Sequence, residues 1–442
     1  MKADLYLSVS ARARFGTGTL MYFAQGIPTG LLAVAMPAWL ASQGADALEI
    51  ASYLAVISLP WAFKLLSGPL MDRYQYPAMG RRRPWVLAAQ LGLALSLLCL
   101  AVIEDPISQI GLLMACGVVV NIFAATQDVA VDGMAIELVP ETEQGRLNAF
   151  MIFGKAMGWA ASSAVSGIVL VSWGLAAAAV LAAICSGIIF FCFLLVRERE
   201  GERLLPWSKG AASGSTVRNT SFSSLFTGIR DVLWSRLSLI VIAIVFSDGL
   251  VSGYGNALTP IAAIKLFGFT TEQWSQLAAS MGLVGALASL GLGPLIDRFG
   301  AKRMLVFVIM LVAAHTFTLA ATQHYWEDTT YVRVMMSIWV LLGPITMVCV
   351  IALAMAICSA QVSATQFAIY MSIANLGASL GSATYGLVAE STSFVQSFVL
   401  MGSMTLATLV VVLFYRSQAF GGASAPAVAT TAVTGDDSRT QE

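Results

Sequence analysis

Apolar stretches of membrane-spanning length follow one another along the chain, and one polar stretch at 197–235 divides them into two equal groups. A helix rises 1.5 Å per residue, so about 20 apolar residues cross the ~30 Å hydrocarbon core of a bilayer. The pattern therefore predicts an all-α integral membrane protein of 12 transmembrane helices, arranged as two six-helix pseudo-repeats. The predicted spans are 16–41, 48–71, 84–103, 107–136, 148–171, 173–196, 236–264, 273–296, 303–323, 331–357, 362–389 and 393–416.

The same pattern predicts four regions. These are an N-terminal six-helix bundle (1–196), a cytoplasmic linker (197–235), a C-terminal six-helix bundle (236–416) and a cytoplasmic tail (417–442). Within the linker, FSSLFTGIRDVLW at 222–234 places apolar residues at helical spacing, which predicts a short amphipathic helix at the membrane surface; a linker with chance periodicity is the alternative. The tail has few large side chains and is expected to be disordered.

Composition and charge placement agree with a membrane protein. The chain is 58% hydrophobic and 11% charged, whereas soluble domains are about 25% charged. Of the 24 lysines and arginines, all but Lys64, Lys155, Lys265 and Arg333 fall in segments on the side of the N-terminus. The positive-inside rule therefore predicts that both termini are cytoplasmic, in a multi-pass protein of the cell (inner) membrane.

Other functional classes lack support in the sequence. The six cysteines are scattered singly and only two histidines are present, so no metal site is expected. No P-loop and no nucleophile elbow occurs, and the charge pattern does not indicate nucleic-acid binding. We expect no enzyme activity; a non-transporting membrane sensor is the alternative from another class.

An internal duplication relates the two halves. GPLMDRY at 68–74 recurs as GPLIDRF at 293–299, and FAQGIPTG at 23–30 recurs as FSDGLVSG at 246–253. The two offsets are nearly equal, and both halves face the same way. Such parallel repeats are typical of transporters whose halves rock about a central site. Gln25 and Asp248 occupy equivalent positions in the repeat, and with Tyr22 and Gln127 they are predicted to line the substrate cavity.

The repeated loop resembles that of the major facilitator superfamily: the segment GPLIDRFGAKR fits the loop pattern of that superfamily. In the first half the longer form DRYQYPAMGRRRPW, together with FAQGIP, LPWAFKLLSGPLMDRY, TQDVAVD and PETEQGR, is similar to the AmpG muropeptide permeases of the peptide/acetyl-coenzyme A transporter family. These features cover about the first 160 residues. The charged residues of the two loops are predicted to form cytoplasmic gate latches: Asp72, Arg73, Arg81, Arg82, Asp297 and Arg298.

Four charges lie at mid-membrane depth. Asp128 and Asp132 are four residues apart, which places them on one helix face, and Lys64 and Lys155 lie at similar depth on two other spans. Buried unpaired charges are costly, so pairing is expected. In one interpretation Asp128–Lys155 or Asp132–Lys64 only joins helices. In the other, at least one carboxylate exchanges a proton as its lysine partner moves away, because burial disfavours and a nearby lysine favours the charged form.

The resemblance implies proton-driven import of a small molecule, with the proton gradient in place of any cofactor. Muropeptides are the leading substrate class; a siderophore, or acetyl-coenzyme A or another organic anion, is the alternative. The expected partners are the substrate and the lipid bilayer, and the chain is expected to act as a monomer without nucleic acid.

Overall fold

The computed structural model describes residues 6–208, 234–358 and 363–415. Within these residues every regular element is a helix, apart from a single parallel bridge between Tyr6 and Arg197. Residues 222–233 of the predicted amphipathic helix and the tail at 417–442 lie outside the described residues, so those two predictions are not tested.

The first half supplies six spans. Gly174 has φ 77° and ψ −175°, a conformation that glycine adopts without strain, and it divides α7 into the fifth and sixth spans. A π-helical turn, Gly30–Ala35, joins α1 to α2, and a 3-10 turn, Lys64–Leu66, joins α3 to α4. The helices are α1 (Ala11–Thr29), α2 (Met36–Ser42), α3 (Ala47–Ala62), α4 (Ser67–Arg73), α5 (Arg83–Cys99), α6 (Ile110–Leu138) and α7 (Glu141–Leu194).

The second half supplies the other six. Its helices are α9 (Arg236–Ile261), α10 (Thr271–Leu290), α11 (Gly293–Phe299), α12 (Ala301–Ala321), α13 (Thr329–Met355), α14 (Ser363–Ala389) and α15 (Phe394–Phe414). Nine helices of the described residues are long and apolar enough to cross a membrane. Because α7 supplies two spans, and α10–α11 and α14 are less apolar spans, the prediction of twelve transmembrane helices is confirmed.

The two halves repeat one packing arrangement. On α7, a Cβ on Gly158 would lie 2.1 Å from the carbonyl oxygen of Phe23, so α7 approaches α1 backbone to backbone. On α14, a Cβ on Gly381 would lie 2.0 Å from the carbonyl oxygen of Leu250 in α9. The fifth span therefore packs on the first as the eleventh packs on the seventh, and these small residues serve close packing within each half.

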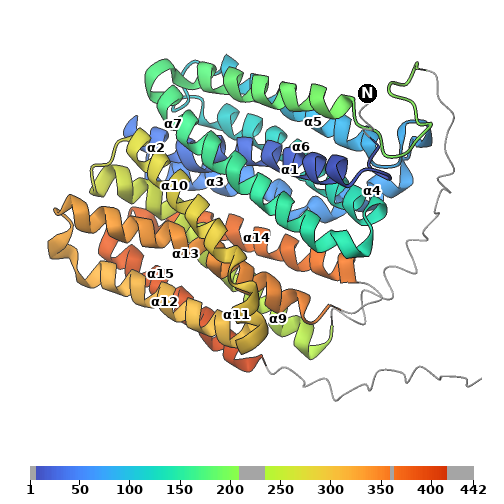
Figure 1. Ribbon diagram of the computed structural model, residues 1–442. Helices are drawn as coiled ribbons and strands as arrows, with labels where there is room; N and C mark the ends of the chain where they lie inside the picture. The colour runs from blue at the N-terminus through green and yellow to red at the C-terminus, as the bar shows by residue number, and fades with distance from the viewer. Residues whose placement is uncertain (1–5, 209–233, 359–362, 416–442) are drawn as a thin grey trace, which may run out of the picture.

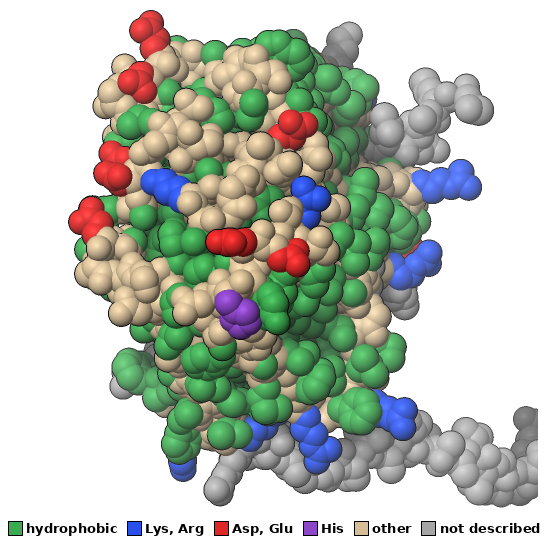
Figure 2. Space-filling view, turned by 90° about the vertical axis from the view of Figure 1, so that its left-hand side faces the viewer, with side chains coloured by type: hydrophobic (Ala, Val, Ile, Leu, Met, Phe, Trp, Pro, Cys, Tyr) green, Lys and Arg blue, Asp and Glu red, His purple; other side chains and the backbone are tan. Residues whose placement is uncertain are grey.

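The helix axes run roughly side by side, with α1–α7 in the upper part of Figure 1 and most of α9–α15 in the lower part. The N-terminus lies at the right-hand end of the bundle in this view, which we call the N-terminal face; we call the opposite end the far face. Figure 2 looks onto the far face, where acidic side chains are scattered among polar and apolar ones. Two acidic residues cap helices of the bundle, since Asp46 precedes α3 and Asp328 precedes α13.

Side-chain hydrogen bonds join the halves from the far face to mid-depth. Lys265 donates to the carbonyl oxygen of Ala45 at 2.5 Å, and Ser379 donates to that of Ala55 at 2.6 Å. Deeper in the bundle, Asn375 donates to the carbonyl oxygen of Trp61 at 3.2 Å. In the described part of the chain, no side-chain hydrogen bond joins the halves between Trp61 and the N-terminal face. Trp61 lies beside Lys64, Lys155, Asp128 and Asp132.

Candidate functional site

The first ion pair of the cluster joins the second span to the fourth. Pro60 cannot donate a backbone hydrogen bond, and α3 ends two residues later at Ala62, so Lys64 begins a short 3-10 turn. Its Nζ lies 2.8 Å from Oδ2 of Asp128 on α6. The Asp128 side chain is 6% exposed and that of Lys64 is 17% exposed. The structure thus pairs Asp128 with Lys64, rather than with Lys155 as one sequence-based interpretation had it.

The second carboxylate has a neutral partner. The hydroxyl of Tyr22 on α1 donates to Oδ1 of Asp132. No lysine or arginine of the described residues lies within ion-pair distance of Asp132, so the predicted Asp132–Lys64 pair is replaced by a tyrosine bond. The two carboxylates, one turn apart on α6, therefore differ in the charge of their partners.

Lys155 on α7 is held by aromatic faces. Its Nζ lies 5.2 Å from the centroid of the Trp61 ring and 5.9 Å from that of the Tyr22 ring. Lys64 approaches the same Trp61 ring at 5.8 Å, and the indole nitrogen of Trp61 donates to Asn121 at 2.7 Å. Trp61 is thus the centre of the cluster. Its place in a second-span stretch of apolar residues gave no sign of this role.

The two glutamines of the predicted cavity differ in their surroundings. Gln25 is fully buried beside Asp128, yet neither its amide nitrogen nor its amide oxygen has a hydrogen-bond partner of good geometry in the described residues. Gln127 donates to the carbonyl oxygen of Met21 at 3.1 Å and to the side-chain oxygen of Gln90 at 2.9 Å. Gln127 therefore joins α6 to α1 and α5 inside the first half, away from the cavity in which it was expected.

Asp248 is the intramembrane acid of the second half. It lies on α9 at the position that repeats Gln25, and it is partly exposed. The neighbouring Ser247 donates to the backbone of its own helix, to the carbonyl oxygens of Ala243 and Ile244. Within the described residues no hydrogen bond or ion pair reaches Asp248. Its role in a substrate cavity stays a prediction.

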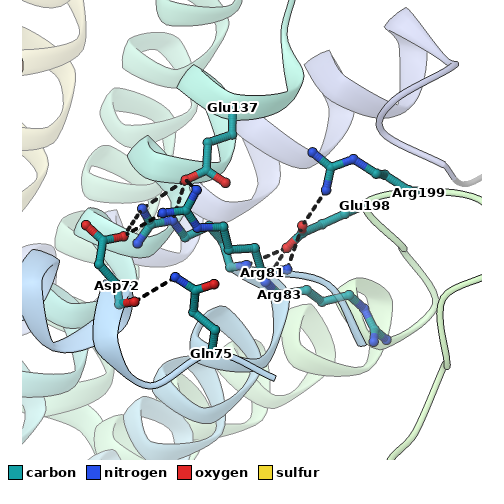
Figure 3. A network of polar contacts seen from close by, with 8 residues as sticks. Asp72, Gln75, Arg81, Arg83, Glu137, Glu198 and Arg199 are labelled. Carbon is teal, nitrogen blue, oxygen red and sulfur yellow. Dashed lines mark hydrogen bonds and ion pairs between the residues drawn. The ribbon is translucent and has the colours of Figure 1, made fainter. Parts of the chain in front are cut away.

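The predicted gate latch of the first half forms a network of ion pairs, shown in Figure 3. Asp72, at the end of the second span, accepts from Arg81 at 3.0 Å and from Arg82 at 2.6 Å. Glu137, at the end of α6, lies 3.4 Å from Arg81 and 2.9 Å from Arg82. The two arginines therefore join the second span to the fourth at the N-terminal face.

The remaining gate residues behave differently. Arg73 lies over the ring of Tyr74 at 5.8 Å and forms no ion pair among the described residues. In the second half Arg298 lies over the ring of Phe299 at 5.4 Å. The side chain of Asp297 lies outside what the structure describes, so a latch in the second half stays a prediction.

A buried carboxylate that the sequence did not single out positions the latch. Glu198, just beyond the sixth span, accepts hydrogen bonds from the backbone nitrogens of Arg81, Arg82 and Arg83 at 2.9, 2.6 and 2.6 Å. Gly80 permits this approach with φ 103°, and a Cβ there would lie 2.7 Å from Cδ of Glu198. In the sequence, Glu198 belongs to the charge run RERE, which is typical of a solvated surface.

Arg83 fixes the same loop from the other side. Its guanidinium, 1% exposed as a residue, donates to the carbonyl oxygens of Leu194, Val196 and Leu204. The start of the linker is thereby tied to the beginning of the third span. Together, Glu198 and Arg83 hold the 80–83 segment so that Arg81 and Arg82 reach Asp72.

Two bundles of six spans, with a buried charge cluster beside their interface and a charged latch at one end, define a membrane carrier. Residues 18–382 match the model of the Major Facilitator Superfamily, and the chain belongs to this family. It is therefore a secondary transporter and a multi-pass membrane protein that moves a small molecule, and not an enzyme.

Curated relatives are similar over most of the chain. The chain is 24% identical over 390 residues to the anhydromuropeptide permease of Escherichia coli (strain K12), covering 84% of this chain and 73% of that protein. It is 21% identical over 394 residues to the putative transporter AmpG 1 of Rickettsia bellii, covering 86% and 92%.

Solved structures share the fold. The nucleoside transporter NupG matches with a TM-score of 0.68 at 12% identity, covering 90% of this chain and 98% of that chain. A D-xylose-proton symporter matches with a TM-score of 0.69 at 15% identity, covering 91% and 97%. At these identities the likeness concerns the fold alone.

Proposed function

We propose that this chain is a proton-coupled importer of muropeptides in the inner membrane. The substrate class is supported by the relatives named as an anhydromuropeptide permease and as AmpG, which align with more than four fifths of the chain. It is also supported by the first-half motifs, among them TQDVAVD at 126–132, which carries both carboxylates of the cluster.

The observation that supports proton coupling is that the two carboxylates on α6, Asp128 and Asp132, have different partners. Asp128 is neutralised by Lys64 at 2.8 Å, whereas within the described part of the chain Asp132 receives only the hydroxyl of Tyr22. A carboxylate at mid-membrane depth without a basic partner is costly when charged. Asp132 is therefore the group that we assign to carry the proton, and Asp128 stays charged while Lys64 is in contact.

Movement of the halves supplies the coupling. Lys64 lies on a short turn between α3 and α4, and Trp61, three residues earlier, is bonded to Asn375 of the second half. When the halves rock, this contact breaks and the position of Lys64 relative to α6 changes. A lysine that moves toward Asp132 favours release of its proton, and one that moves away favours uptake.

We further propose that both termini are cytoplasmic, so that the N-terminal face with its arginine-rich latch faces the cytoplasm. Import then ends with release at this face. The carrier uses the proton gradient as its energy source and acts as a monomer.

The test is uptake into proteoliposomes that contain the purified full-length chain. With a pH gradient that is acidic outside, we expect radiolabelled anhydromuropeptide to accumulate above its external concentration. We expect an uncoupler to abolish the accumulation, and liposomes without protein to show none. Uptake that does not depend on the pH gradient would contradict proton coupling. Transport of a ferric siderophore or acetyl-coenzyme A, without transport of anhydromuropeptide, would contradict the proposed substrate. Binding of anhydromuropeptide without any uptake would indicate a non-transporting sensor.

A further inference from the structure

We propose that Lys155, with the rings of Trp61 and Tyr22, forms an anion subsite at mid-membrane depth, which binds a carboxylate group of the transported molecule. The inference rests on the proposed transport function and narrows it: the substrate carries a carboxylate, and this group docks on the first half. The supporting observations are that Lys155 has no ion-pair partner among the described residues and that its side chain is partly exposed.

Lys155 is a cation whose charge is not neutralised by direct contact. No carboxylate oxygen of the described residues lies within 4.0 Å of its Nζ, and its contacts are the rings of Trp61 and Tyr22. Lys64, at the same depth and on the same Trp61 ring, has Asp128 at 2.8 Å. An ammonium group in a membrane interior requires an anion or several acceptors. Among the described residues, Asp128 and Asp132 act on Lys155 only from beyond ion-pair distance.

Gln25 does not take part in the subsite. Its side chain is 0% exposed and lies against Asp128. Asp128 therefore has Lys64 and Gln25 beside it, and the Lys155 ammonium is the donor that an arriving carboxylate meets. Charge-assisted bonds between an ammonium and a carboxylate are among the stronger hydrogen bonds.

Part of the surface of the cluster is exposed. Lys155, Trp61 and Tyr22 each keep part of their surface exposed, whereas Gln25 and Asp128 are buried. Asn375 of the second half bonds to the backbone of Trp61, which places the cluster at the interface between the halves. A molecule bound between the halves therefore meets Lys155 and two aromatic faces, which suit packing against a sugar ring or another flat group.

The charges around the subsite couple binding of the anion to binding of a proton. The groups that face Lys155 are Asp128 and Asp132 on α6, Lys64 on the second span and Tyr22 on α1. Asp128 is neutralised by Lys64, so Asp132 is the charge that would repel an arriving carboxylate. A proton on Asp132 removes that repulsion, and the substrate anion and the proton would then bind together.

The experiment measures ligand binding to the purified full-length protein by isothermal titration calorimetry. Two matched pairs of probes are used: anhydromuropeptide with its methyl esters, and citrate, which is unrelated to cell walls, with trimethyl citrate. The variants are Lys155→Gln, Lys155→Arg and, as the control, Arg146→Gln. Arg146 lies on the same helix over the ring of Phe15 at 5.3 Å, but it is exposed near the N-terminal face.

We expect the acid of a pair to bind at least about tenfold more tightly than its ester. Lys155→Gln should remove this preference, Lys155→Arg should retain most of it, and Arg146→Gln should leave it unchanged. Unchanged thermal unfolding of Lys155→Gln shows that it is folded, and if that variant does not fold, the acid preference of Lys155→Arg relative to the wild type decides.

The outcomes separate this inference from the proposed function. If citrate binds in a Lys155-dependent manner and anhydromuropeptide does not bind, the anion subsite stands and the muropeptide proposal fails. If the muropeptide acid and ester bind equally, or Lys155→Gln keeps the preference, the subsite is refuted while muropeptide transport stands. If no acid binds better than its ester, the subsite is also refuted.

Discussion

The ammonium nitrogen of Lys64 lies 2.8 Å from Oδ2 of Asp128, and this contact joins the second span to the fourth at mid-membrane depth. Both groups are largely withdrawn from solvent, so each compensates the desolvation of the other. Asp132, one turn along the same helix, has no such partner among the residues that the structure describes and accepts a hydrogen bond from Tyr22. The contrast between the two carboxylates is the basis of the proposed coupling.

Lys64→Ala should destabilise the protein by about 3 kcal/mol, because it leaves Asp128 buried and unpaired. Asp128→Ala in the same chain should recover a large part of this loss. Denaturation of the single and double variants in detergent gives the coupling energy of the pair. The same cycle for Lys155 and Asp128 should give a smaller value, since Lys155 is not within ion-pair distance. An equal or larger value for that second cycle would mean that the pairing described here is not the dominant one.

Asp132→Asn should abolish accumulation driven by a pH gradient while exchange of labelled for unlabelled substrate continues, because the amide keeps the shape of the site but cannot take up a proton. Parallel uptake and exchange assays in proteoliposomes measure the two activities. Tyr22→Phe, which removes the hydroxyl bonded to Asp132, should lower accumulation less than Asp132→Asn. Normal accumulation by Asp132→Asn would exclude this residue as the proton carrier.

Gly158→Ala should disrupt the packing of α7 on α1, because the added Cβ would meet the Phe23 carbonyl oxygen at 2.1 Å. Overpacking of this kind costs about 1–3 kcal/mol. The control is Gly187→Ala on the same helix, where a Cβ meets nothing within 4 Å. Thermal unfolding in detergent compares the two variants. Similar melting temperatures for both would contradict the close approach of the two backbones.

Glu198→Gln should loosen the 80–83 segment, because an amide oxygen is a weaker acceptor than a carboxylate for three backbone N–H groups. We expect a loss of about 1–3 kcal/mol and faster hydrogen exchange at the amides of Arg81, Arg82 and Arg83. Glu104→Gln, on an exposed loop at the far face, is the control. Equal exchange protection in the two variants would show that Glu198 does not hold the loop.

Glu202 should make stability depend on pH. Burial raises the pKa of this carboxyl group above its usual value, although its oxygen accepts from the backbone nitrogens of Glu198 and Arg199. The folded protein therefore holds the proton to higher pH than the unfolded chain. The resulting stability is full below the unfolded pKa of about 4.3 and is lost as pH rises through the folded pKa.

Thermal unfolding of the wild type and Glu202→Gln, from below pH about 4.3 upward, tests whether the Glu202 contribution to stability is lost as pH rises. The melting temperature of the variant should rise relative to that of the wild type as pH increases. A difference that stays constant with pH would show that Glu202 does not titrate differently on folding.

Much of the fold could be predicted from the pattern of apolar and polar residues along the chain. Each span is helical because its backbone must satisfy its own hydrogen bonds in lipid, and it is long and apolar because it crosses the hydrocarbon core, so the twelve helices could be placed from hydropathy within a few residues. The repeated GPL-x-DR segments likewise indicated two equivalent halves. The depth of Asp128, Asp132, Lys64 and Lys155 could be counted from the helix ends at a fixed rise per residue.

The sequence by itself thus determined that the chain is a two-part helical membrane carrier with charges at mid-depth, because both properties depend on distances along one helix. Only the tertiary structure decided which charges meet. It paired Asp128 with Lys64, gave Asp132 to Tyr22, left Lys155 on aromatic faces, and brought Glu198 onto a loop more than a hundred residues away. Such contacts depend on the rotation of each helix about its axis and on the packing of helices distant in sequence, and neither is encoded in the hydropathy of a single span.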